Sequence, residues 1–211
     1  MSFDCVYGQE KQTAILRRAL TAARVPHAYL FYGMRGIGKQ TVARQFAKAL
    51  NCKKGNGVAC EQCPSCLKIT NGNHPDVVTI VPEGIFIKIT HVREMQNQIK
   101  FKPFEGEKRV FIVVDAERMN EPAANALLKT LEEPSPANVL ILVTSRPFQL
   151  PETILSRCQK LRFDPIRKET IVSFFGREGS IGSATGDYYC LVCQGKYREC
   201  TGTHKANTSV G

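Results

Sequence analysis

The 211-residue sequence has no long run of apolar residues. Its first residues carry charge from Asp4 onward and contain no apolar block of signal-peptide length. Nowhere do about 18 uncharged apolar residues follow one another, as a membrane-spanning helix would require. We therefore expect a cytoplasmic protein with no membrane partner. With 43% apolar and 23% charged residues, the chain can bury the core of one full domain and a fragment of another.

Acidic residues are scarce relative to basic ones, 19 against 29, so the formal net charge is +10. A basic surplus raises the local concentration of partners that carry phosphate groups. However, the sequence lacks any single run of lysines and arginines that would mark a binding strip. The surplus therefore fits a polyanionic partner and a generally basic surface equally well.

Short apolar segments alternate with amphipathic ones. Strands are predicted at 28–32, 77–81, 109–115, 139–144 and 160–163, and helices at 9–23, 41–50, 89–99 and 122–134. The strand segments are continuous runs of Val, Ile and Leu, which is typical of strands covered on both faces. The predicted fold class is α/β, with a parallel sheet flanked by helices.

A glycine-rich turn joins the first predicted strand to the next predicted helix. Gly33, Gly36, Gly38 and Lys39 have the GxxxxGK spacing of a Walker A loop. In such a loop the backbone N–H groups and the helix N-terminus face the phosphates of a nucleotide, and the lysine reaches the terminal ones. The alternative is a glycine turn that merely connects a strand with a helix.

The residue that should bind magnesium is missing after this lysine. Gln40 stands where Ser or Thr would ligate Mg²⁺, and Thr41 comes one place late. One step along a helix rotates a side chain by about 100°, so we do not expect Thr41 to substitute without adjustment. Binding of ATP with Mg²⁺ is left open, and metal-dependent hydrolysis is in doubt.

The strand segment RVFIVVD ends in an acid, as a Walker B strand does, which makes Asp115 the candidate magnesium ligand. An active ATPase of this type has a glutamate next, but Ala116 occupies that place. Glu117 lies one further on, where strand alternation is expected to turn it away from the site. Together with Gln40, this predicts a nucleotide site with weak or no hydrolysis.

Nine cysteines are many for a cytosolic chain, in which a thiol cluster more often binds a metal than forms disulfides. Four lie in one short segment: Cys52, Cys60, Cys63 and Cys66. Four thiolates can complete a tetrahedral Zn²⁺ shell without an open position, so the predicted zinc site is structural. Unconnected cysteines or a redox pair are the alternatives.

The last part of the chain differs in composition. Residues 177–211 are rich in Gly, Ser and Thr and have neither a helical nor a strand period, so we expect an irregular tail. The tail holds a second set with ligand-like spacing: Cys190, Cys193, Cys200 and His204. Whether that set binds a metal is left open.

Several segments together resemble the bacterial clamp loaders of DNA polymerase III, which have the AAA+ P-loop NTPase fold. The segments are VYGQE, RVPHAYLF, GMRGIGK, the four-cysteine insert, HPDVV, ANALLKTLEEP and SRC. The resemblance runs from residue 1 to about residue 175. It is to the delta-prime and tau/gamma subunits of that family. The changes at Gln40 and Ala116 favour the delta-prime type, because the tau/gamma motors keep both catalytic residues.

The resemblance implies roles for further residues. Arg157, in SRC, would be an arginine finger that reaches the ATP site of a neighbouring subunit, and Thr144 and Ser145 match the sensor region that contacts the terminal phosphate. The partners it implies are the tau/gamma and delta subunits of this DNA-directed DNA polymerase holoenzyme, the sliding clamp and primed DNA. It places the protein in the replisome at the nucleoid.

The resemblance also implies a domain plan. An AAA+ domain is expected at 1–163, with the zinc insert at about 51–68, followed by the start of a small helical lid domain at 164–176. We expect the collar domain of the family to be missing from these 211 residues. Two other functions stay open: a tau/gamma-type motor ATPase of the same clamp loader, and a zinc-bearing nucleic-acid binding module.

Overall fold

The structure is a computed structural model that describes residues 6, 8–55 and 57–166. These residues contain one five-stranded sheet in the order β2-β3-β4-β1-β5. Its strands are β1 (Ala28–Tyr32), β2 (Val77–Ile80), β3 (Arg109–Val114), β4 (Asn138–Thr144) and β5 (Gln159–Arg162). All neighbouring strands pair in parallel. The predicted tail with its second cysteine set, and the lid segment from residue 167 on, lie outside the described residues.

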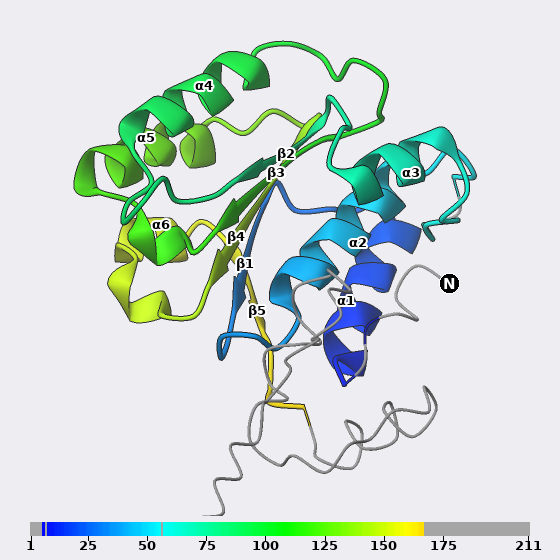
Figure 1. Cartoon of the computed structure of the whole chain (residues 1–211), viewed down its shortest axis with the longest axis horizontal. Helices are drawn as coiled ribbons and strands as arrows, with labels where there is room; N and C mark the ends of the chain where they lie inside the picture. The colour runs from blue at the N-terminus through cyan, green and yellow to red at the C-terminus, as the bar shows by residue number, and fades with distance from the viewer. Residues whose placement is uncertain (1–5, 7, 56, 167–211) are drawn as a thin grey trace, which may run out of the picture.

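Helices cover both faces of this sheet (Figure 1). One face carries α1 (Glu10–Thr21), α2 (Lys39–Asn51) and α3 (Pro64–Asn71), and the other carries α4 (Ile89–Ile99), α5 (Glu121–Glu132) and α6 (Glu152–Leu155). Two short 3-10 helices, η1 (Ala116–Arg118) and η2 (Pro147–Gln149), follow β3 and β4. None of the helices within residues 6–166 is long and apolar enough to span a membrane.

Alternate residues of strands β1 to β4 enter two separate cores. Ala28 and Leu30 of β1 pack in the cluster that includes residues of α4, α5 and α6, whereas Tyr29 and Phe31 pack in the cluster under α1 and α2. The seven residues of β4 are all buried. Burial on both faces explains why the strands are continuous apolar runs, and the predicted α/β class is confirmed.

The parallel arrangement gives the sheet two chemically distinct edges. The carboxyl ends of all strands lie at one edge and the amino ends at the other. Helix α2 begins directly after the glycine loop, and its 13 residues span about 20 Å back along the sheet to the cysteine segment. The glycine loop and the cysteine segment therefore lie at opposite edges (Figure 1).

Candidate functional site

The loop between β1 and α2 requires glycine at several positions. Gly36 and Gly38 have φ angles of +85° and +92°, in the left-handed region that residues with a Cβ atom rarely adopt. A Cβ atom on Gly33 would lie 2.4 Å from the carbonyl oxygen of Phe163, which follows β5. The glycines therefore allow both the tight turn and its close packing against the end of β5.

Lys39 is the first residue of α2, and its side chain turns back into the loop. Its Nζ atom donates hydrogen bonds to the carbonyl oxygens of Gly33 and Met34 at 2.8 and 2.6 Å. Only 6% of the residue is exposed. The loop thus holds a cation at the N-terminus of a helix, where an anion is favoured. Gln40 and Thr41 follow on α2 and are partly exposed.

The strand register brings the other predicted nucleotide-site residues to the same edge. β4 lies between β1 and β3, with Thr144 opposite Tyr32 and Val143 opposite Val114. Thr144 and Ser145 therefore leave the sheet between the glycine loop and Asp115. Asp115 has left-handed backbone angles, φ 51° and ψ 50°, and its Oδ2 atom lies 3.8 Å from Nε of Arg118.

The expectation that Glu117 points away from this edge is wrong. β3 ends at Val114, and the left-handed Asp115 leads into η1, so strand alternation does not apply to Glu117. Its Oε1 atom accepts hydrogen bonds from the backbone N and the hydroxyl of Ser145, at 3.2 and 2.7 Å. Burial alone would raise the pKa of Glu117, but hydrogen bonds from Ser145 and Thr144 outweigh it and lower the pKa.

Ala116 is fully buried, and its methyl group belongs to the core under α4 and α5. A glutamate side chain at this place would have to leave that core to reach a nucleotide. The position after Asp115, where an active ATPase of this type has its water-activating glutamate, therefore carries no carboxylate, and Glu117 is already bonded to Ser145.

Arg157 lies apart from these residues. It immediately precedes Cys158 and β5, and therefore lies near the amino-terminal edge, opposite the glycine loop. Its Nη2 atom lies 2.9 Å from Oε1 of Glu132 at the end of α5, and its Nη1 atom donates to the carbonyl of Thr153 at 2.9 Å. The guanidinium is thus partly exposed and does not serve the glycine loop of its own chain.

The four cysteines of the segment 52–66 converge. The Sγ atoms of Cys52, Cys60, Cys63 and Cys66 all lie within 4.8 Å of one another. Cys52 is the C-cap of α2, and Cys63 is the N-cap of α3, so two helix ends position the cluster. Sulfur atoms about 2.3 Å from a tetrahedral zinc ion are about 3.8 Å apart, which these positions can meet.

Backbone N–H groups prepare two of the sulfur atoms to carry negative charge. The N–H of Cys63 donates to Sγ of Cys60 at 3.2 Å, and that of Cys66 donates to Sγ of Cys63 at 3.4 Å. The N–H groups of Gln62 and Cys63 lower the pKa of Cys60 to about 6, whereas burial raises the pKa of Cys66 to about 12. The convergence of the four sulfur atoms is consistent with a structural metal site.

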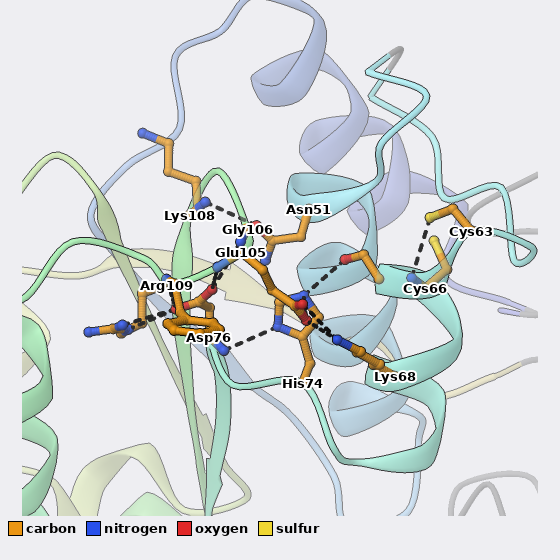
Figure 2. Close-up of polar contacts among 12 residues, drawn as sticks. Asn51, Cys63, Cys66, Lys68, His74, Asp76, Glu105, Gly106, Lys108 and Arg109 are labelled. Atoms are coloured by element: carbon orange, nitrogen blue, oxygen red, sulfur yellow. Dashed lines mark hydrogen bonds and ion pairs between the residues drawn. The ribbon is translucent and has the colours of Figure 1, made fainter.

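A buried ion pair at the same edge was not predicted from the sequence. Asp76, just before β2, is fully buried, and its Oδ1 atom lies 3.0 Å from Nη2 of Arg109, the first residue of β3. The two carboxylate oxygens also accept backbone N–H groups from Phe104, Glu105 and Gly106 at 2.7 to 2.9 Å (Figure 2). Every charged atom of this buried carboxylate is thus paired.

His74 connects the ion pair with the cysteine module. Its Nδ1 atom accepts the backbone N–H of Asp76 at 3.1 Å, so the neutral ring carries its proton on Nε2. That atom lies 3.0 Å from the hydroxyl of Ser65 on α3, and Lys68 of the same helix binds Glu105 at 2.6 Å (Figure 2). Burial lowers the pKa of His74. The HPDVV segment was the only sequence signal of this network.

The sheet order and the glycine loop after β1 define an AAA+ type of nucleotide-binding domain. A solved structure of the RuvB Holliday junction branch migration motor of Thermotoga maritima matches with a TM-score of 0.56 at 17% identity, over 81% of this chain and 50% of that one. A gamma subunit-related protein of DNA polymerase III from the same organism matches with a TM-score of 0.52 at 25% identity, over 75% and 47%.

The sequence comparisons are more specific. The family model described as "DNA polymerase III, delta subunit" matches residues 8–167, and the chain belongs to this family of clamp-loader subunits. The delta-prime subunit of Bacillus subtilis is 37% identical over 163 residues, which are 77% of this chain and 50% of the relative. The tau subunit of that organism is 40% identical over 171 residues, 81% of this chain and 30% of the relative. The chain thus spans half the length of these relatives or less.

Proposed function

We propose that the chain is a clamp-loader subunit of the delta-prime type, which acts as a stator in ATP-dependent loading of the sliding clamp onto primed DNA. Its partners are the tau/gamma and delta subunits. In this proposal it hydrolyses little or no ATP itself and lends Arg157 to the ATP site of a neighbouring subunit. One observation carries the proposal: the phosphate loop is complete, while Gln40 and buried Ala116 occupy the two positions that hydrolysis needs.

The loop supports phosphate binding without efficient catalysis. Lys39 and the N-terminus of α2 supply positive potential, and Asp115 lies at the end of a strand two places away in the sheet. The neutral amide of Gln40 is a poorer partner for Mg²⁺ than the hydroxyl that P-loop enzymes use. A nucleotide bound here would occupy the site and stabilise the fold, while, among the described residues, Ala116 supplies no base and Glu117 is already bonded to Ser145.

The position of Arg157 supports action on another subunit. It lies near the edge opposite its own glycine loop, and its side chain is 37% exposed. Glu132 and the carbonyl of Thr153 hold the guanidinium in place at this surface. An arginine that reaches a transferring phosphoryl group from outside accelerates hydrolysis by about 10³ to 10⁵. A subunit without its own catalysis can therefore still control turnover in its neighbour.

We also assign Zn²⁺ to the cluster of Cys52, Cys60, Cys63 and Cys66. Four sulfur ligands leave no open coordination position, so the ion would stabilise the fold and take no part in chemistry. About 20 Å of helix α2 separates it from the glycine loop. The zinc ion should therefore stabilise mainly the segments at the amino-terminal edge of the sheet.

The test of this function is the ATPase rate of the reconstituted clamp loader that contains the Arg157→Ala variant. We expect a fall of at least tenfold, with Arg162→Ala as the matched control, because Arg162 is exposed and pairs only with Asp164 in the described structure. An unchanged ATPase rate with Arg157→Ala would show that Arg157 is not an arginine finger. Rapid ATP turnover by the isolated chain, abolished in Lys39→Ala, would instead indicate a motor of the tau/gamma type.

A further inference from the structure

A buried lysine lies beside the cysteine cluster. Lys48 belongs to the last turn of α2, and only 4% of the residue is exposed, although lysine is almost never fully buried unless its charge is paired. It precedes Cys52 by four positions, and residues four apart leave the same face of a helix. The nucleotide site follows β1 at the other end of α2, so it does not account for this cation.

A carboxylate of the cysteine segment pairs with this cation. Nζ of Lys48 lies 2.6 Å from Oε2 of Glu61, which directly follows Cys60. The lysine side chain is 5% exposed and the glutamate side chain 41%, so the cation is the buried end of the pair. The ion pair therefore ties the turn at residues 60–63, which leads into α3, to the side of α2 (Figure 1).

The backbone of Glu61 faces the sulfur atoms. Its φ angle is +58°, in the left-handed region, which is uncommon for a residue other than glycine. Burial raises the pKa of Cys66, and a hydrogen bond from the backbone N–H of Glu61 opposes that rise. The next N–H groups of the turn act in the same way, since that of Cys63 donates to Sγ of Cys60 at 3.2 Å. Lys48 thus holds the side chain of a residue whose backbone supports the cluster.

The charges at the cluster explain why a cation is favourable at this position. Four thiolates and one Zn²⁺ ion together carry a net negative charge. Glu61 adds a carboxylate one position from Cys60. Negative charges close to one another disfavour the ionised thiolates that a metal requires. Lys48 offsets both charges from a buried position, where solvent screens an ionic interaction less.

We propose that Lys48 is a positioning residue for the metal of the cysteine cluster. Its ion pair with Glu61 holds the turn at residues 60–63 against the sulfur atoms, and its charge offsets the negative charge of the loaded site. An ammonium group has no lone pair to offer a metal, so Lys48 acts beside the four sulfur ligands and does not replace one of them. The inference rests on one part of the proposed function, the assignment of Zn²⁺ to these cysteines.

The test measures the zinc affinity of the full chain by competition with a chromogenic chelator. We expect Lys48→Met to bind zinc about 10-fold to 100-fold more weakly, the range for groups that support metal ligands from outside the coordination shell. Lys48→Arg keeps a cation and should stay near the wild-type affinity. Lys54→Met is the matched control, because it removes the same charge from an exposed lysine of the same segment.

A spectroscopic measurement distinguishes this role from a contribution to packing alone. With Co²⁺ in place of zinc, the thiolate-to-metal charge-transfer band moves electron density away from sulfur. A cation near the sulfur atoms opposes that movement, so saturated Lys48→Met should absorb at longer wavelength than the wild-type chain. A variant that only loosens the packing of α2 would give an unshifted band once Co²⁺ saturates it.

A double-mutant cycle tests whether Lys48 acts through Glu61. Glu61→Gln keeps the backbone and removes the carboxylate, so the loss of Lys48 should matter less in its presence. We therefore expect Lys48→Met/Glu61→Gln to bind zinc more tightly than Lys48→Met alone. Losses of affinity that simply add would show that the ion pair is not the means by which Lys48 acts, and would contradict the proposal.

Other results would also overturn it. An unchanged zinc affinity in Lys48→Met would show that Lys48 does not support the metal, and an equal loss in Lys54→Met would show that only the overall charge matters. An equal loss in Lys48→Arg and Lys48→Met would show that a cation is not required. In each of these cases the zinc assignment and the clamp-loader function would stand. A wild-type chain that binds no zinc would overturn the zinc assignment together with this inference.

Discussion

Glu117 and Ser145 join the turn after β3 to the end of β4: one carboxylate oxygen of Glu117 accepts both the backbone N–H and the hydroxyl of Ser145. The two residues lie at the edge that carries the glycine loop. Hydrogen bonds from Ser145 and Thr144 overcome the effect of burial and lower the pKa of Glu117, so it is ionised at neutral pH. The pair thus fixes the segment that follows Asp115.

We predict that Glu117→Ala lowers the free energy of unfolding by about 1–3 kcal/mol, the range for a hydrogen-bonded and partly buried charged group. Urea unfolding at pH 7 measures the change. Glu133→Ala is the control, because Glu133 is an exposed glutamate at the end of α5. Equal midpoints for the two variants would show that the link to Ser145 contributes no stability.

The buried ion pair of Asp76 and Arg109 should make the free energy of unfolding depend on pH in the acid range. Burial alone would raise the pKa of Asp76, but three backbone N–H groups and Arg109 outweigh it and lower the pKa. A carboxyl group whose pKa is lower in the folded than in the unfolded state stabilises the fold at pH values above the pKa of the unfolded state. This stabilisation is lost as the pH falls through the pKa of the folded state.

We therefore expect Asp76→Asn to cost about 3–5 kcal/mol at pH 7, because Arg109 would be left buried without its partner. The difference from the wild-type chain should shrink as pH falls below about 4, the ordinary aspartate value. Urea unfolding at pH 7, 5 and 3 measures it, with Asp164→Asn as an exposed control. A difference that stays constant over this range would contradict the assigned role of the carboxylate.

We predict that removal of the metal loosens some segments of the chain and leaves others unchanged. Ser65 and Lys68 on α3 contact His74 and Glu105, so α3 connects the cysteine cluster to loop 100–108. Chelation, or the Cys63→Ser variant, should increase amide hydrogen exchange in α3 and in this loop. The glycine loop at the far end of α2 should be unaffected at first.

Zinc content measured on the native protein accompanies that experiment, and Cys158→Ser is the matched control because Cys158 lies outside the cluster. Faster exchange over the whole chain would indicate that the cluster supports global folding. No change in exchange, with full loss of zinc, would show that α3 does not depend on the metal.

The sequence predicts correctly those parts of the structure that depend on residues close together in the chain. The apolar runs predict the strands, and the GxxxxGK spacing predicts the turn before α2, because each pattern is local. The orientation of Glu117 was predicted wrongly, since alternation assumes a strand that in fact ends at Val114. The left-handed conformation of Asp115 carries no clear sequence signal.

The network around Asp76 could not be predicted for a different reason. Asp76 and Arg109 are 33 positions apart, and only the pairing of β2 with β3 brings them together. His74 and Ser65 are only nine positions apart, but Ser65 belongs to α3 and His74 to the loop before β2, and no periodic pattern of the sequence links them. A buried charge cannot be assigned a partner until the sheet order is known.

Nucleotide binding gives the most direct test of the site after β1. In the proposed site Lys39 binds the phosphates, whereas Gln40 does not coordinate Mg²⁺. The affinity of the chain for ATP should therefore change little when Mg²⁺ is added. Lys39→Ala should weaken binding at least about tenfold, since a charge-assisted contact contributes about 1.5–3 kcal/mol. Calorimetric titration with and without Mg²⁺ measures both effects.

The Gln40→Thr variant separates the metal ligand from the rest of the site. It restores the hydroxyl at the magnesium position, so ATP should bind this variant more tightly with Mg²⁺ than without it. Its hydrolysis rate should stay low, because Ala116 is buried and supplies no base. Strong magnesium dependence in the wild-type chain would show that Thr41 or Asp115 already holds the ion. Arg44→Ala serves as the control, because it removes a cation further along α2 without touching the loop.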